Sequence, residues 1–334
     1  MVSHPSREFR GSAGLAVLLA ACASGPTSSA GPGTELVLSF QGLPLLDPAT
    51  EGRYEVWLVV SGGQRRSAGV FVPGGAVVLP MSAPAMAIEI TVEPPADDDP
   101  GPSAQTLLRG EVVRGRADLV VAGGLTQGRL PLTQVPGQFT MFTPSDNKES
   151  GYPSHEESGT WLFNMAPHDT PQDDMWVRLA QLRAGWVYEG WMVRDYGTPQ
   201  AVWLSYGKFL PDQTGAVNQR DDTGWGPFSG VLDFQTAGDE EFPGDDWIAN
   251  PLGFPIPGTL SLPLDLREKD PTGGFRWTHV ITIEPAWNRG EAITSERPFG
   301  IRPYRDPFGD GPPGGPRTIT FHQDGVPRGT ATVR

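Results

Sequence analysis

The sequence predicts an all-β protein with two antiparallel, immunoglobulin-like β-sandwich domains in tandem. Three observations lead to this prediction. Short runs of alternating β-branched or aromatic residues recur along the chain. Turn-forming stretches separate these runs, in keeping with 43 Gly and 35 Pro residues among 334. Two strand motifs also occur twice, in the same order. Short, evenly spaced strands with turn signals between them are typical of antiparallel sandwiches.

The first domain is expected over residues 35–134. Turn signals such as SGG and VPGG separate its strands, and the Pro- and Asp-rich segment 94–104 is too polar to pack as a strand. The expected strands lie at 34–40, 53–60, 67–72, 75–81 and 87–94, with closing strands at 105–115 and 117–124.

The second domain is expected over residues 135–310, with a long insertion near 210–265. Segment 173–185 fits a short helix or a strand, and we favour the strand. The tail at 311–334 begins as a linker. It ends either as a disordered segment or as a hairpin, since TITFH and TATVR flank an Asp-Gly turn. The other expected strands lie at 137–146, 160–165, 186–193, 198–209 and 276–285.

The repeated motifs predict that the second domain is a diverged copy of the first. YEVW at 54–57 returns as YEGW at 188–191, and ITVEP at 90–94 returns as ITIEP at 281–285. The sequence offset grows from 134 to 191 residues between the two motifs. The second copy therefore carries an insertion of about 57 residues.

The N-terminus has the features of an export signal. Two arginines precede an apolar run at 13–21, which is too short to span a bilayer as a helix. The run ends in LAAC, which resembles a bacterial lipobox and implies cleavage before Cys22 and acylation of its thiol. We therefore expect a signal peptide at 1–21, a tether at 22–34 and a membrane anchor at Cys22. In a Gram-negative envelope, Ala23 favours the outer membrane. An ordinary signal peptide with a chance cysteine is the alternative.

Charge and cysteine content exclude some classes of function. The net charge is −14 and no Lys/Arg cluster occurs, so a nucleic-acid partner is not expected. The chain contains one cysteine, so it cannot form an internal disulfide.

The repeated motifs resemble the C-terminal, extracytoplasmic domain of the anti-sigma-K factor family. The matching positions are Tyr54, Trp57, Glu93 and Pro94 in the first copy and Tyr188, Trp191, Glu284 and Pro285 in the second. The resemblance implies fold-determining rather than catalytic roles for these residues. From the residues themselves, we expect each Trp in the core and each Glu to accept hydrogen bonds from a loop backbone.

The same resemblance implies a non-enzymatic sensing, binding or scaffold module in the cell envelope. Anti-sigma factors of this family carry a sigma-binding segment and a membrane helix before this domain. A lipid signal is expected in their place here, so direct sigma-factor binding is not expected.

Acidic loops are the candidates for a metal site, because calcium prefers several oxygen ligands. The favoured cluster comprises Asp239, Glu240, Glu241, Asp245 and Asp246. No EF-hand spacing is present, and a solvated acidic face is the alternative. No other cofactor is expected.

The sequence offers little support for an enzyme. It contains no GxSxG elbow and no Gly-rich phosphate loop between a strand and a helix. Two carboxylates suffice for a retaining glycosidase, and that alternative stays open.

Three aromatic residues of the insertion are candidates for a binding face. Trp225, Phe228 and Trp247 occur in polar, Gly-, Pro- and Asp-rich segments. Exposed loop aromatics suit docking of an envelope protein or a glycan. Alternatively, they pin the insertion onto the sandwich. The runner-up function is accordingly a carbohydrate-binding or calcium-stabilised surface module.

Overall fold

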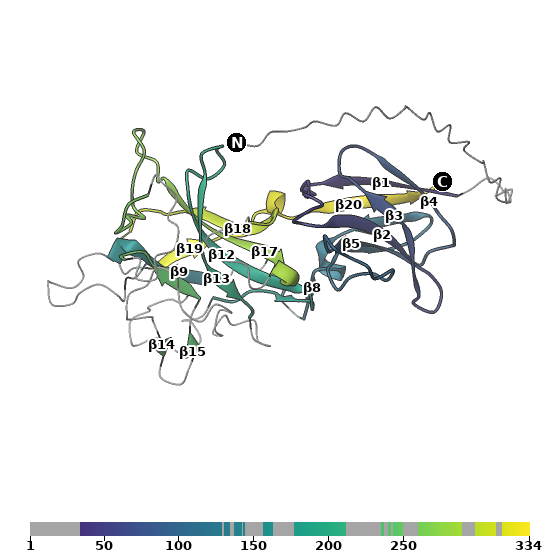
Figure 1. Cartoon of the computed structure of the whole chain (residues 1–334), viewed down its shortest axis with the longest axis horizontal. Coiled ribbons are helices and arrows are strands. Elements are labelled where there is room, and N and C mark those ends of the chain that lie inside the picture. Colours follow the sequence, from purple (N-terminus) through teal and green to yellow (C-terminus); the bar gives the residue numbers. More distant parts are fainter. Residues whose placement is uncertain are drawn as a thin grey trace, which may run out of the picture. The chain divides into compact units, whose positions relative to one another are not determined.

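The computed structural model of the chain is built of strands, turns and short 3-10 segments (Figure 1). No α-helix occurs among the residues it describes, which confirms the all-β prediction. The described residues are 34–128, 130–133, 137–141, 143, 156–162, 177–211, 235–236, 240–241, 243–249, 260–288, 298–311 and 316–334.

The first sandwich consists of two four-stranded antiparallel sheets. One has the order β3 (Arg65–Phe71), β2 (Arg53–Val59), β5 (Ala87–Glu93) and β6 (Thr106–Glu111). The other has the order β4 (Val77–Pro80), β1 (Glu35–Gln41), β20 (Arg328–Val333) and β7 (Arg116–Leu119). Alternate residues of both sheets, such as Leu36 and Leu38 of β1 and Val56 and Leu58 of β2, meet in one buried core. An immunoglobulin-like connection of these strands stays a prediction.

The last strand of the chain completes this first sandwich. β20 pairs on one side with β1, from Leu36↔Val333 to Gln41↔Arg328, and on the other with β7. The expected tail hairpin is therefore wrong, since β19 (Pro316–Ile319) pairs with β9 and not with β20. The physical reason is that β1 and β7 would otherwise present two unpaired edges. The Asp-Gly pair lies instead in a short 3-10 turn, Gln323–Gly325.

The second sandwich also contains two four-stranded sheets. One has the order β13 (Val202–Phe209), β12 (Trp186–Arg194), β17 (Trp277–Pro285) and β18 (Ile301–Pro307). The other has the order β16 (Gly244–Asp246), β10 (Gly159–Trp161), β9 (Gly137–Thr140) and β19.

Two smaller ladders accompany the sandwiches. β8 (Thr126–Gln127) pairs with β11 (Gln181–Leu182), and β14 (Gln235–Thr236) with β15 (Glu240–Glu241). The described part of segment 173–185 thus contains a short strand.

The central strands of the two sandwiches have the same register. In β2, Tyr54 faces Val92 of β5, and in β12, Tyr188 faces Ile283 of β17. Tyr54 and Tyr188 are separated by 134 residues, and Val92 and Ile283 by 191 residues, which are the two offsets found between the repeated motifs. The ladders β2–β3 and β12–β13 each contain an irregularity just before the motif tryptophan. The two sandwiches therefore share their central geometry as well as their sequence motifs.

Candidate functional site

The motif residues of the first sandwich form a buried hydrogen-bond network. The indole Nε1 of Trp57 donates to the Thr91 hydroxyl at 2.9 Å, and that hydroxyl donates to Glu93. The second carboxylate oxygen of Glu93 accepts the backbone N–H of Ser103 at 3.0 Å. Burial of the carboxyl raises the pKa of Glu93. The carboxylate is engaged in fixing a loop, and Pro94 follows it at the end of β5.

The second sandwich repeats this network. Trp191 Nε1 donates to the Thr282 hydroxyl at 2.9 Å, which donates to Glu284. Glu284 accepts the backbone N–H of Phe299 at 2.8 Å, and Pro285 is the last residue of β17. In both copies the glutamate accepts a loop N–H, as expected from its place at a strand end.

The motif tryptophans are buried, but they face away from the core between the sheets. Tyr54, Val56 and Leu58 belong to the main core, and successive side chains of a strand point to opposite faces. Trp57, 3% exposed, therefore lies on the outer face of its sheet. Trp191 packs in a separate cluster with Val193 and Val280. Both tryptophans are therefore buried core residues, as expected, and they pack on the outer faces of their sheets.

The structure describes only some of the expected binding and metal residues. Cys22, Trp225, Phe228 and Asp239 lie outside the described residues, and Glu240 and Glu241 form β15. Asp245 and Asp246 lie in β16, opposite Thr160 and Gly159, with their side chains fully buried. Within the described ranges, no group of three or more His, Cys, Asp or Glu side chains could hold a metal ion.

Trp247 is fully buried in the main core, so the exposed binding face expected at this residue is wrong. Its backbone N–H donates to the Ser158 carbonyl at 2.7 Å, and its carbonyl accepts the Leu264 N–H at 3.0 Å. The insertion rejoins the sandwich at β16, and the side chain of Trp247, the residue after this strand, lies in the core. Trp247 therefore fits the alternative interpretation, in which an aromatic residue pins the insertion onto the sandwich.

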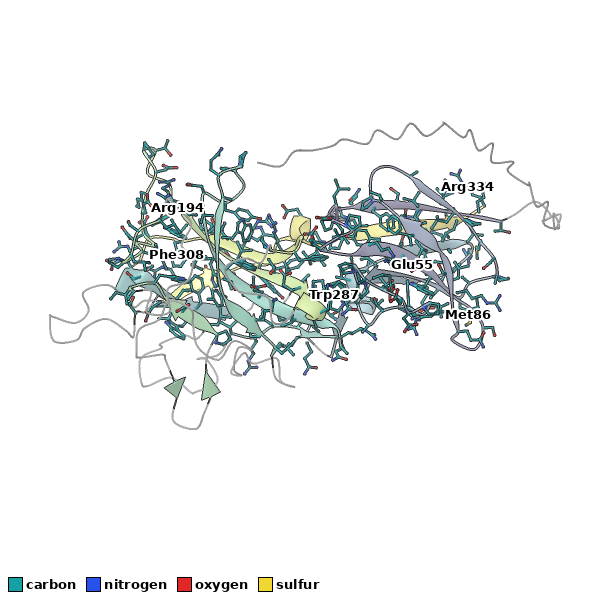
Figure 2. All side chains as sticks on the ribbon, viewed as in Figure 1. Glu55, Met86, Arg194, Trp287, Phe308 and Arg334 are labelled. Atoms are coloured by element: carbon teal, nitrogen blue, oxygen red, sulfur yellow. The ribbon has the colours of Figure 1, made fainter. Side chains whose placement is uncertain are left out.

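A polar groove that the sequence analysis missed lies beside the last residue of β12 and the first residue of β17. Its volume is about 530 Å³, and its lining residues are Arg194, Asp195, Thr198, Gln200, Val202, Asp270, Pro271 and Arg276. Arg194, which Figure 2 labels, binds Glu268 through two hydrogen bonds of 2.9 and 2.7 Å. Arg276 binds the same carboxylate at 2.8 Å and holds Asp195 with its Nε, also at 2.8 Å.

The charges of the groove compensate one another. Hydrogen bonds from Arg276 lower the pKa of Asp195, and hydrogen bonds from Arg194 lower the pKa of Glu268. Half-buried aromatic residues adjoin this network: Tyr196 packs edge-on against Trp203, and the Arg302 guanidinium lies 4.6 Å from the Trp203 ring centre. A polar groove beside aromatic side chains has the composition of a recognition surface.

A buried Tyr–His pair distinguishes the second core from the first. The Tyr206 hydroxyl lies 2.7 Å from His279 Nε2, and burial lowers the pKa of His279 to about 3. Gly190 makes room for the pair, since a Cβ there would lie 1.7 Å from the Tyr206 ring. His279 is fully buried, so the pair is an element of packing.

The strand architecture and these networks define an all-β protein whose two sandwiches share one central motif. Residues 7–106 match the family model described as Anti-sigma-K factor rskA, C-terminal. The match includes β1 to β5 and the first motif network, so this part of the first sandwich is similar to an anti-sigma-factor-related C-terminal domain, and the similarity suggests a regulatory or sensing module.

The other comparisons give no relative. No curated protein and no solved structure matches the chain significantly. Among the described residues, no helix is long and apolar enough to cross a membrane.

Proposed function

We propose that the protein is an envelope lipoprotein, anchored through Cys22, whose sandwiches act as a non-enzymatic sensing, binding or scaffold module. The match of residues 7–106 to the anti-sigma-factor-related domain is the observation that carries this proposal. The LAAC motif at Cys22 supports the lipid anchor, and Ala23 supports an outer-membrane location in a Gram-negative envelope.

The second sandwich is, in this proposal, a diverged copy of the first. The common register, the common irregularity before each tryptophan and the two Trp–Thr–Glu networks support a duplication. Duplication followed by divergence lets one copy keep the scaffold while the other acquires a partner. The polar groove supports this division of roles: by the sequence offsets, the positions of Arg194 and Arg276 correspond to Val60 and Ala85 in the first sandwich.

The groove of the second sandwich is the proposed recognition surface, and its partner is an envelope protein. Paired side chains hold the groove in a fixed shape, which lowers the entropy cost of binding. The aromatic pair Tyr196 and Trp203 favours a glycan as the second candidate, because sugar rings pack on aromatic faces.

In-cell cross-linking and pull-down of the full-length chain tests the recognition surface. Gln200→Arg puts a bulky cation at an exposed position in the groove. Gln323→Arg makes the same change at an exposed position in the 3-10 turn Gln323–Gly325 and is the matched control. Loss of a discrete protein in Gln200→Arg alone supports the proposal.

Recovery of the same protein from both variants would show that this partner does not bind in the groove. Recovery of glycan alone, reduced in Gln200→Arg, would favour the second candidate.

A further inference from the structure

Three segments converge at one end of the first sandwich. Thr34 precedes β1, the loop 81–86 joins β4 to β5, and the turn 112–115 joins β6 to β7. The Met81 N–H donates to the Thr34 carbonyl at 2.9 Å, and the Val112 N–H donates to the Met86 carbonyl at 2.7 Å. Figure 2 shows Met86 and Arg334 at this end. We name it the distal end of the first sandwich.

The distal end presents apolar surface. A hollow of about 480 Å³ is lined by Thr34, Met81, Ser82, Ala83, Pro84, Ala85, Val112, Gly115 and Val333. Beside it, the side chains of Met86 and Val113 are 59% and 65% exposed. An apolar hollow with exposed apolar side chains at its rim is typical of an interaction surface.

The charges at the distal end differ in sign from the chain as a whole, whose net charge is −14. Arg114 lies at the tip of the 112–115 turn with a φ of 52°, and Arg66 lies at the start of β3; both are exposed. Neither forms an ion pair with another described residue. Arg109 binds Glu111 at 2.8 Å. Glu35 is a nearby carboxylate that forms no ion pair with another described residue.

The contacts between the two sandwiches come from the opposite end of the first. Gln105 Nε2 donates to the Gly185 carbonyl at 3.1 Å, and Trp186 Nε1 donates to the Thr106 carbonyl at 3.1 Å. These contacts lie at the first residue of β6, Thr106, and its neighbour Gln105. The last residue of β6, Glu111, lies at the distal end. Among the described residues, no hydrogen bond joins the second sandwich to the distal end.

The position of the proposed anchor restricts what can cover this end. Thr34, a lining residue of the hollow, follows Cys22 by twelve residues. Twelve residues span at most about 43 Å even when fully extended. If Cys22 is held in a bilayer, the distal end is thus kept close to that bilayer.

We propose that the distal end of the first sandwich docks on the lipid bilayer surface. Met86 and Val113 enter the headgroup region, and Arg114 faces anionic headgroups, because apolar side chains next to cations are the combination that binds such interfaces. This inference rests on the proposed lipid anchor at Cys22. Docking fixes the orientation of the first sandwich at the membrane surface.

Photo-cross-linking of the full-length chain tests the docking. A photoreactive residue replaces Val113 in one protein and Val72 in another. Val72, at 71% exposed, follows β3 at the opposite end of the sandwich and is the matched control. Each protein is reconstituted in vesicles of phosphatidylethanolamine and phosphatidylglycerol, and cross-links to lipid are measured.

Lipid cross-links at position 113, with few at position 72, are the expected result. Arg114→Glu should then lower cross-linking to anionic vesicles by roughly fivefold or more. Equal cross-linking at both positions, or cross-links from position 113 to protein alone, would overturn the docking.

The mass of the N-terminal peptide from the same samples separates the two proposals. Acylated Cys22 without lipid cross-links at position 113 contradicts docking and leaves the anchor in place. Unmodified Cys22 contradicts the anchor, and lipid cross-links at position 113 would then support docking by themselves.

Discussion

Removal of the last strand should unfold the first sandwich, although most of that sandwich lies more than 200 residues earlier in the chain. Truncation after Gly325 removes β20, which forms six register pairs with β1 and four with β7. Each pair contributes about one ladder hydrogen bond, at roughly 0.5–1.5 kcal/mol net. The summed loss is roughly 5–15 kcal/mol, the whole stability of a typical domain. Burial of Ala331 and Val326 is lost as well.

Hydrogen–deuterium exchange measures this effect strand by strand. In the truncated chain, residues 35–41 and 116–119 should lose protection, while β12 and β17 of the second sandwich keep theirs. Ala331→Asp, which puts a charge at a fully buried position, should produce the same pattern. Arg328→Ala, at an exposed position of the same strand, is the control. Native protection of residues 35–41 in the truncated chain would refute the assignment of β20 to the first sandwich.

Three further predictions concern the second sandwich. Arg276→Met should lower the free energy of unfolding by about 1–2 kcal/mol at pH 7, because two carboxylates lose their cation. The pKa values of its partners, Asp195 and Glu268, are lowered in the folded protein. Their contribution to the free energy of unfolding is therefore present above the unfolded pKa values near 4 and is lost as pH falls. The difference between wild type and variant in urea titrations should close below pH 4, and a constant difference would contradict the ion pairs. His279→Gln should relieve acid sensitivity. The folded pKa of His279 is lowered to about 3, so the wild type should lose about 1.4 kcal/mol per pH unit between pH 6.5 and 3. If the free energy of unfolding fell equally with pH in both proteins, a neutral, buried imidazole would be excluded. Gly190→Ala should lower the melting temperature far more than Gly309→Ala, and its effect should be smaller in a Tyr206→Ala background, because the added Cβ meets that ring.

The core strands could be predicted from the sequence because their signals are local. Alternation around the motifs at Tyr54 and Tyr188 fixed which residues point together, and ITVEP and ITIEP identified the neighbouring strands. The loop-facing roles of Glu93 and Glu284 also followed, since a carboxylate at a strand end is close to unpaired backbone N–H groups.

The partner of β20 could not be predicted, because pairing with β1 joins residues nearly 300 positions apart. The local Asp-Gly turn signal favoured a hairpin, but two open strand edges outweighed it. Trp247 was misplaced for a similar reason. Its neighbours are acidic and turn-forming, and only the pairing of β16 with β10 shows that the segment enters the core.

The polar groove left no sequence signal at all. Arg194 ends β12 and Asp195 follows it, while Glu268 and Arg276 precede β17 about 80 residues later. Neither segment has a motif, and the network exists because β12 and β17 pair along their whole lengths.

The central claim is that the protein is a lipid-anchored envelope module. Membrane fractionation of the wild type and Cys22→Ala, with mass spectrometry of the N-terminal peptide, tests it most directly. The account predicts a wild-type peptide that begins at an acylated Cys22 and protein in the membrane fraction, with Cys22→Ala released from it. An unmodified Cys22, or equal fractionation of the two proteins, would contradict the claim.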